Sequence, residues 1–489
     1  MARNAPAVRY STAQMDAALA TFRQQYPAFE DTRLLDDLRA TDYARLDNEG
    51  QLYLDYTGGG LYAERQIRAH LDMLSQRVFG NPHSDNPTSS AMTELVEHAR
   101  AFILEYFNAD PDEYAAIFTL NASGALKLVG ESYPFAAGGR YLLTFDNHNS
   151  VNGIREFARA KGAEITYVPM QPPDLRVSND LIAAHLDQMG SGPCLFSYPA
   201  QSNFTGVQHP LEWMEWAHAR GWDVLVDGAA FVPTNRLDLS RWHPDFVPLS
   251  FYKMFGYPTG VGCLLARRAA LAKLQRPWFA GGTIWAVTVQ GDRHYMAEGE
   301  AAFEDGTLSY LSLPAVEIGL KHLLSIGVET IHTRVMTLTG WLLDNLLALR
   351  HDTGTPVACV YGPRDCQMRG GTIALNFLDP QGKVIDERVV SRRANMHTIS
   401  LRTGCFCNPG AGEAAFSISK ESMAGLFVGE ETMTYEQFLT ALGLPSGGAV
   451  RVSLGLATTF ADVYRFMEFA QTFLNDVPDE GGLPARQHC

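Results

Sequence analysis

Residues 246–266 read FVPLSFYKMFGYPTGVGCLLA and place one lysine, Lys253, between two apolar runs. The apolar positions on its two sides are Phe246, Val247, Leu249, Phe251, Val261, Cys263, Leu264 and Leu265. Runs of this kind predict two buried strands with Lys253 on the turn between them. A lysine among apolar groups either extends its amine to water or has its pKa lowered by desolvation. In the second case the amine can form a Schiff base with an aldehyde, although a lysine at a strand end is more often a solvated surface charge.

The composition is that of a folded protein with no basic surface for nucleic acid. The 489 residues include 39 Lys and Arg and 54 Asp and Glu, for a net charge of −15. Because binding to a phosphate backbone is driven by clustered basic residues, we expect no nucleic-acid partner. The first residues lack the apolar core of a secretory signal, and no stretch approaches the ~20 apolar residues of a membrane span. We therefore expect a cytoplasmic protein with two or three domains and no membrane partner.

The seven cysteines do not form the pattern of a disulfide framework. They are few in a long chain and odd in number: Cys194, Cys263, Cys359, Cys366, Cys405, Cys407 and Cys489. In a reducing compartment we expect free thiols, most of them packing residues.

From Ala115 onward, apolar strands alternate with helical stretches. The predicted strands are AAIFTL, RYLLTF, EITYVPM, CLFSYPA and DVLVDGAAF, with helices near 151–161 and 211–220. This alternation predicts an α/β fold with a mostly parallel sheet and helices on both faces. In such sheets ligands bind at the carboxyl ends of the strands.

Polar side chains stand at the ends of four of these predicted strands. They are Ser123, His148, Asn203 and Asp227, and Lys253 comes after the next strand. Each has an ordinary explanation as a cap or turn residue. Together they supply a helix end for a phosphate, a ring that can stack, a polar group, a carboxylate and an amine. That set suits pyridoxal phosphate, whose aldehyde, ring nitrogen and phosphate need these partners.

Nine stretches resemble the class V aminotransferase family of fold-type I pyridoxal-phosphate (PLP) enzymes. Within that family the similarity is greatest to the cysteine desulfurase domain of molybdenum cofactor sulfurases. The stretches run from about residue 50 to about residue 460: YLDYTGGGLY, FGNPHSDN, IFTLNASGALKLV, YPAQSNFTG, VDGAAFV, SFYKMFGYPTGVGCLL, FEDGTLSY, LRTGCFCNPG and VRVSLG. The resemblance implies a large doubly wound domain and a smaller α+β C-terminal domain.

The resemblance also implies roles for residues around the cofactor. Lys253 would form the Schiff base, Asp227 would pair with the pyridine nitrogen, and His148 would stack on the ring and act in catalysis. The remaining cofactor contacts would be Asn203 at the phenolic oxygen, the Ala122 backbone, Ser123 and Ser250 at the phosphate, Tyr252, and Thr307 at the phosphate of a neighbouring subunit. A contact of that kind implies a homodimer. Two departures from the family pattern are Ala230, where a polar residue is common, and Tyr252, where a histidine is common.

Substrate contacts are predicted at three further positions, of which the resemblance implies only Arg451. Arg451 would bind the substrate carboxylate through its bidentate fork, although it could also be the polar residue of an alternating strand. Asn81 and His83 could face the site, and turn or cap roles explain them equally well.

The stretch 401–410, LRTGCFCNPG, carries two thiols on a predicted loop. From the residues alone, Cys405 and Cys407 could be a packing pair, part of a metal site, or a nucleophile. A metal is the least favoured because one CxC pair lacks the further ligands of a structural zinc site, and we predict none. By the resemblance, Cys407 matches the desulfurase nucleophile, while Cys405 is a neighbour seen in the sulfurases.

These observations predict the following organisation and function. We expect an N-terminal segment (1–65) packed on the small domain, a large PLP-binding domain (66–325), a small domain (326–475) whose cysteine loop faces the large domain, and a tail (476–489). The expected activity is PLP-dependent removal of sulfur from L-cysteine or a related small amino acid, giving alanine and a protein persulfide. The alternatives are a β-lyase, aminotransferase or racemase, and a scaffold without cofactor. The chain ends at Cys489 without a counterpart of the C-terminal sulfurase domain, so the sulfur acceptor is unknown.

Overall fold

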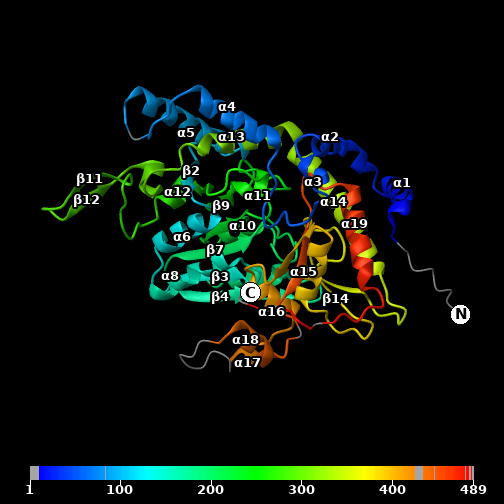
Figure 1. The fold of residues 1–489 in the computed structure, drawn as a ribbon. Coiled ribbons are helices and arrows are strands. Elements are labelled where there is room, and N and C mark those ends of the chain that lie inside the picture. Colours follow the sequence, from blue (N-terminus) through cyan, green and yellow to red (C-terminus); the bar gives the residue numbers. More distant parts are fainter. Residues whose placement is uncertain are drawn as a thin grey trace.

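A seven-stranded sheet lies at the centre of the computed structural model, which describes residues 10–82, 84–424, 433–444, 446–479, 481–483 and 486 (Figure 1). The strand order is β2-β10-β9-β8-β7-β3-β4. The bounds are β2 (Tyr114–Thr119), β3 (Arg140–Thr144), β4 (Glu164–Val168), β7 (Cys194–Pro199), β8 (Asp223–Asp227), β9 (Phe246–Ser250) and β10 (Gly262–Arg267). Strands β9, β8, β7, β3 and β4 are parallel, whereas β10 runs antiparallel to both β9 and β2. The predicted mostly parallel sheet is confirmed.

Both faces of this sheet are buried, because successive strand residues point to opposite sides. In β2, Ala115 and Ile117 pack in one apolar layer with α6 (Ala122–Ser132) and α8 (Ile154–Ala160). Ala116 and Phe118 join the larger core on the other face with α5 (Pro87–Tyr106). Strands buried on both faces explain the continuous apolar runs of the sequence.

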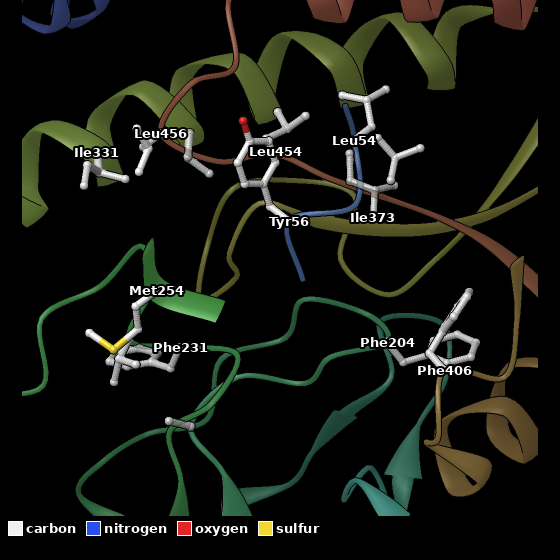
Figure 2. Close-up of a cluster of buried hydrophobic side chains, with 14 of the residues drawn as sticks. Leu54, Tyr56, Phe204, Phe231, Met254, Ile331, Ile373, Phe406, Leu454 and Leu456 are labelled. Atoms are coloured by element: carbon white, nitrogen blue, oxygen red, sulfur yellow. The ribbon is translucent and has the colours of Figure 1, made fainter. Parts of the chain in front are cut away.

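A smaller sheet with the order β13-β14-β17-β16 is antiparallel throughout. Its strands are β13 (Ala358–Tyr361), β14 (Thr372–Phe377), β16 (Arg402–Gly404) and β17 (Ala449–Ser453). Helices α14 (Val328–Ala348), α15 (Glu387–Met396) and α19 (Phe460–Ala470) pack on it. Figure 2 shows apolar side chains of this part, including Leu454, Leu456, Ile331 and Ile373, gathered around Tyr56 of the N-terminal segment.

The N-terminal segment packs against the elements of the smaller sheet. Helices α1 (Met15–Gln25) and α2 (Leu34–Ala40) lie beside α14 and α19 (Figure 1). Strand β1 (Leu52–Tyr53) pairs in parallel with β15 (Ile399–Ser400). Arg39 of α2 forms an ion pair with Asp462 of α19, and both side chains are buried. The domain boundaries themselves stay a prediction.

The structure corrects several predicted element bounds. Lys253 lies in a one-turn helix, α11 (Phe251–Phe255), rather than in a turn. Helix α5 begins at Pro87, because Asn86 caps it and proline fits the first helical position. The helix near 151–161 is divided at Gly153 into α7 (Asn149–Asn152) and α8, and that expected at 211–220 is α10 (Trp213–His218).

The other elements connect or flank these layers. They are α3 (Arg45–Asn48), α4 (Glu64–Gln76), β5 (Met170–Gln171), β6 (Arg176–Val177), α9 (Asn179–Leu186), α12 (Arg268–Leu271), β11 (Ile284–Thr288), β12 (Arg293–Met296), α13 (Leu313–Ile326), α16 (Pro409–Ala415), α17 (Lys420–Ala424) and α18 (Tyr435–Leu442). The β11–β12 hairpin projects from the body (Figure 1). Within the described residues, no helix has the length and apolar character needed to cross a membrane, and no cluster of three or more metal-ligating side chains is found.

We predict that Arg39→Ala destabilises the protein by about 3 kcal/mol, because removing one partner of a buried ion pair leaves the other charge uncompensated. Arg33→Ala is the control: the Arg33 side chain is 71% exposed and pairs with Glu30, so its loss should cost under about 1 kcal/mol. Urea unfolding measures both. Equal effects of the two substitutions would contradict the role of Arg39.

Candidate active site

A cavity of about 190 Å³ lies at the carboxyl ends of the parallel strands. Eight of the residues predicted to bind a cofactor line it: Ala122, Ser123, His148, Asn203, Asp227, Ser250, Tyr252 and Lys253. The other lining residues are Asn121, Leu126, Ser150, Pro199, Gln201, Ala229 and Ala230. The strand-end residues recognised in the sequence therefore share one cavity.

Lys253 is partly buried and lines this cavity. Burial lowers the pKa of Lys253, with Asp227 acting in the opposite direction and the nearby arginines Arg451 and Arg402 adding to the lowering. A lowered pKa increases the fraction of neutral, nucleophilic amine.

The glycine run 58–60 of the N-terminal segment packs against the backbone around Lys253 and contributes to the burial of this residue. The Gly60 amide donates to the Tyr252 carbonyl at 3.0 Å. A Cβ at Gly60 would lie 2.9 Å from the Lys253 carbonyl oxygen, too close for any other residue. The glycine is therefore needed for the close approach of two backbone segments.

One end of the cavity gathers hydroxyl groups at the start of α6. The Ala122 amide donates to the Ser250 hydroxyl at 2.8 Å, and the Ser123 and Ser150 hydroxyls are 2.6 Å apart. Helix α6 is capped by Asn121, whose side chain accepts from the Gly124 amide. Hydroxyls and a helix N-terminus together suit a phosphate.

Among the lining residues that sequence reasoning missed are two with polar side chains, Ser150 and Gln201. Ser150 lies in the same strand-end segment as His148, and its position at the start of a helix is the signal that also marked Ser123. Gln201 is buried and accepts from the Gln208 side chain at 3.1 Å. A glutamine two residues before Asn203 carries no signal of its own.

His148 and Asp227 supply the ring and the carboxylate of the predicted set. Burial lowers the pKa of His148 to about 4, and the positive charge of Lys253 acts in the same direction, so the ring is neutral at pH 7. Its Nδ1 accepts from the Ser150 amide at 3.1 Å, which leaves the proton on Nε2. Asp227 is 8% exposed at the end of β8, and its Oδ1 accepts from the Ala229 amide at 3.0 Å.

Arg451 is buried rather than placed on a polar strand face. Its Nη1 donates to the Asn203 carbonyl at 3.0 Å, its Nη2 donates to Asp55 at 2.9 Å, and the guanidinium lies 4.7 Å from the centre of the Phe406 ring. Its Nε is buried without a hydrogen-bond partner. Asp55 also pairs with Arg402, and neither residue was singled out from the sequence.

The cysteine loop between β16 and α16 is docked on the ends of β3 and β7. The Asn149 amide donates to the Cys407 carbonyl at 2.7 Å. Asn408 donates to the Asp146 carbonyl at 2.7 Å and to the Asn203 side chain at 2.8 Å, and Asn203 in turn donates to the Phe406 carbonyl at 2.8 Å. The expectation that this loop faces the large sheet agrees with these contacts.

The loop backbone is strained where it carries the thiol. Phe406 and Cys407 have φ angles of 57° and 54°, in the left-handed region that costs a non-glycine residue roughly 1–2 kcal/mol. The Phe406 ring packs against Phe204 (Figure 2). Strain of this kind persists only where surrounding contacts hold it, and here the asparagine contacts and the Phe406 packing do so.

The two loop thiols differ in state. Cys407 is free and exposed, and a negative charge on its sulfur would raise the pKa of Lys253. Cys405 is disulfide-bonded, which corrects the expectation of free thiols throughout. Sequence spacing cannot show that a second thiol comes near in the fold, whereas Cys194, Cys263, Cys359 and Cys366 are free as expected.

Of the predicted site residues that the structure describes, four do not line this cavity: Asn81, Thr307, Cys407 and Arg451. Thr307 is exposed and lines a separate hollow of about 280 Å³ with Leu120 and Val261. Asn81 is exposed and is not among the described residues that line the Lys253 cavity. His83 lies outside the described residues.

The comparisons with known proteins agree with this geometry. The family model "Aminotransferase class-V" matches residues 52–466. The chain belongs to the class-V aminotransferase family. Among curated relatives, a molybdenum cofactor sulfurase from Arabidopsis thaliana is 35% identical, over 96% of this chain and 61% of the relative. The chain spans about half to three fifths of the length of the curated relatives that it matches.

Solved structures share the fold at low identity. A cysteine desulfurase from Thermococcus onnurineus has a TM-score of 0.73 and 22% identity, covering 90% of this chain and 98% of that one. A C-DES variant with glycine covalently linked to its PLP cofactor has a TM-score of 0.66 and 18% identity, covering 88% of this chain and 98% of that one. The predicted fold class, that of fold-type I PLP enzymes, is confirmed.

We predict that Asn408→Asp loosens the cysteine loop. The aspartate keeps the oxygen that caps the Ala411 amide but loses the donors to Asp146 and Asn203. Two hydrogen bonds of about 1 kcal/mol each make amide exchange over 405–410 at least about tenfold faster. Hydrogen–deuterium exchange with mass spectrometry measures this.

Asn345→Asp is the matched control for the loop experiment. The Asn345 amide donates to the Trp341 carbonyl within α14, so its loss should leave exchange over 405–410 unchanged. Unchanged exchange in Asn408→Asp as well would show that the asparagine contacts do not hold the loop.

Proposed function

We propose that the protein is a PLP-dependent cysteine desulfurase that removes sulfur from L-cysteine, with Cys407 as the sulfur-accepting thiol. The observation that carries the proposal is a free, exposed thiol on a docked loop, near enough to Lys253 for its charge to affect that amine. The relatives named as molybdenum cofactor sulfurases support it. The neutral His148 ring and the buried Lys253 amine are the groups available for proton transfer.

The lining residues fit PLP as a cofactor. Lys253 would hold its aldehyde, Asp227 its ring nitrogen, His148 one ring face, and Ala122, Ser123 and Ser250 its phosphate. The hydroxyls and the α6 helix start offer donors to an anion at one end, and the buried Asp227 carboxylate stands among the strand-end residues. When bound, PLP would supply an electron sink for the substrate Cα. The side-chain amide of Asn203 donates one proton to the Phe406 carbonyl and has a second proton to donate to the cofactor. Tyr252 lines the same cavity and would contact the cofactor there.

The chain's own residues would carry the remaining chemistry. Arg451 would hold the substrate carboxylate, and Lys253 would move the Cα proton. The Cys407 thiolate would attack the substrate sulfur, so that an S–S bond forms at Cys407 as the substrate C–S bond breaks. The electron pair of the C–S bond stays on carbon, which takes a proton and leaves as alanine. The outer sulfur of the persulfide would then pass to an acceptor. We also propose that the protein is located in the cytoplasm.

The alternative function is a β-lyase, aminotransferase or racemase acting on another small amino acid at the same site. In that case Cys407 would take no part in turnover, and a lyase would give pyruvate rather than alanine. The docked and strained Cys407 loop favours the desulfurase, because a bystander thiol needs no such support.

We predict that Cys407→Ser lowers alanine formation from L-cysteine about a hundredfold or more, since the accepting nucleophile is lost. Cys366→Ser, a change at another free and exposed thiol, should leave the rate unchanged. Alanine, sulfide and pyruvate are measured with the PLP-loaded protein under reducing conditions. Full turnover by Cys407→Ser, or pyruvate as the product, would establish the alternative.

We further infer a homodimer in which Thr307 reaches the partner's cofactor phosphate. The β11–β12 hairpin stands out from the body and exposes Trp285, Val287, Val289 and Tyr295, which a monomer would leave in water (Figure 1). The hollow beside Thr307 is also apolar, with Leu120 71% exposed. Exposed apolar groups of this density mark an interaction surface.

We predict that Val289→Glu weakens the dimer about tenfold or more, because the interface would have to desolvate a charge. Val78→Glu replaces an exposed valine beyond the end of α4 and should have no effect. Light scattering over a dilution series should give about twice 53.9 kDa for the wild type and for Val78→Glu, and a lower mass for Val289→Glu. A wild-type mass of one chain would contradict the dimer.

A further inference from the structure

Asp55 joins two arginines at the edge of the site. Its carboxylate accepts from Arg451 Nη2 at 2.9 Å and from Arg402 Nη2 at 2.7 Å, and Arg402 Nε adds a contact at 3.0 Å. The Arg451 side chain is 3% exposed and the Arg402 side chain 50%. One carboxylate thus bridges a buried guanidinium and one that is open to solvent.

The local backbone is built around this bridge. A Cβ at Gly58 would lie 2.5 Å from Asp55 Oδ2 and 2.6 Å from Arg402 Nη2, so a side chain at this position would displace the two paired groups. The amides of Gly58 and Gly59 donate to the Asp55 carbonyl, and Asp55 pairs with Ser453 as an isolated bridge. The backbone that carries the Asp55 carboxylate is therefore fixed by contacts with Gly58 and Gly59 and by the bridge to Ser453.

Arg451 still has a donor to offer. Its Nη1 is used by the Asn203 carbonyl and its Nη2 by Asp55, whereas the buried Nε has no partner. A buried donor without an acceptor is costly, which points to an anionic ligand at that position. Nε and Nη2 share one edge of the guanidinium fork, so an acceptor at Nε lies next to Asp55.

The net charge of Arg451, Arg402 and Asp55 determines how many negative charges a bound substrate can have. Two guanidinium cations and one carboxylate leave one net positive charge, which a single substrate carboxylate neutralises. Both arginines lower the pKa of the Lys253 amine, so the charges of both influence the place where the substrate reacts. A second anionic group on the substrate would meet Asp55 without a free cation to pair with.

We propose that Asp55 is a specificity-determining residue that acts by positioning and neutralising Arg402, so that the site selects amino acids with one carboxylate and disfavours those with an anionic side chain. The proposal rests on the proposed function in one respect, the binding of the substrate carboxylate by Arg451. It assigns to the DYTGGG segment (55–60) a selection against a second negative charge on the substrate.

The test compares L-cysteine with L-cysteine sulfinate, which differs by an anionic side chain. Cysteine sulfinate and water give alanine and sulfite by cleavage of the C–S bond, and no protein thiol takes part. In the PLP-loaded Asp55→Asn variant, which keeps the side-chain shape, the ratio of kcat/KM for sulfinate to that for cysteine should rise about tenfold, chiefly through KM for sulfinate.

The double variant Asp55→Asn, Arg402→Gln is the matched control for charge. It restores one net positive charge, so the sulfinate-to-cysteine ratio should return to within about twofold of the wild type. A ratio unchanged in Asp55→Asn, or one that stays raised in the double variant, would overturn the proposal.

A binding experiment separates this proposal from the proposed reaction. L-alanine and L-aspartate are titrated while the absorbance of the bound cofactor is followed, so turnover is not needed. Asp55→Asn should strengthen aspartate relative to alanine, and Arg402→Gln, a change at a half-exposed side chain, should weaken it. If the relative affinities for aspartate and alanine shift in this way but alanine formation does not depend on Cys407, the role of Asp55 is supported and the desulfurase activity is rejected. If the ratio of the two affinities is unchanged in both variants, the role of Asp55 is rejected.

Discussion

The buried guanidinium of Arg451 is the constraint that ties the active site to the rest of the fold. Removing such a charge from water costs several kcal/mol unless hydrogen bonds and an opposite charge compensate it. The compensation comes from three separate parts of the chain: the Asp55 carboxylate, the Asn203 carbonyl and the Phe406 ring. The N-terminal segment, the parallel sheet and the cysteine loop must therefore all be in place before Arg451 is accommodated.

The same contacts fix the position of the reactive thiol. Asn203 contributes its carbonyl to Arg451 and its side chain to the cysteine loop, and Asn408 links that side chain to the end of β3. This network holds Phe406 and Cys407 in left-handed backbone conformations that an isolated loop would leave. Because these contacts attach the loop to the sheet, they fix the position of the Cys407 thiol relative to Lys253.

The fold and the cofactor cavity could largely be predicted from the sequence, because their signals are local. Apolar runs buried on both faces predict the strands, and polar residues directly after them, such as Ser123 and Asp227, fall at one sheet edge by the geometry of parallel strands. Asp55 and Arg402 could not be found in this way, since they pair across 347 residues and no local pattern marks either one as the partner of the other. The disulfide-bonded Cys405 was missed for the same reason, whereas the helix around Lys253 was missed because five residues are too few to show a period.

The central claim is that the strand-end residues form one cofactor site around Lys253. The most direct test is to incubate the protein with PLP, reduce it with borohydride, and map the modified peptide by mass spectrometry. The account predicts one pyridoxyl group per chain, on Lys253, and none in the Lys253→Ala variant. A protein that takes up no pyridoxyl group, or takes it up at another lysine, would contradict it.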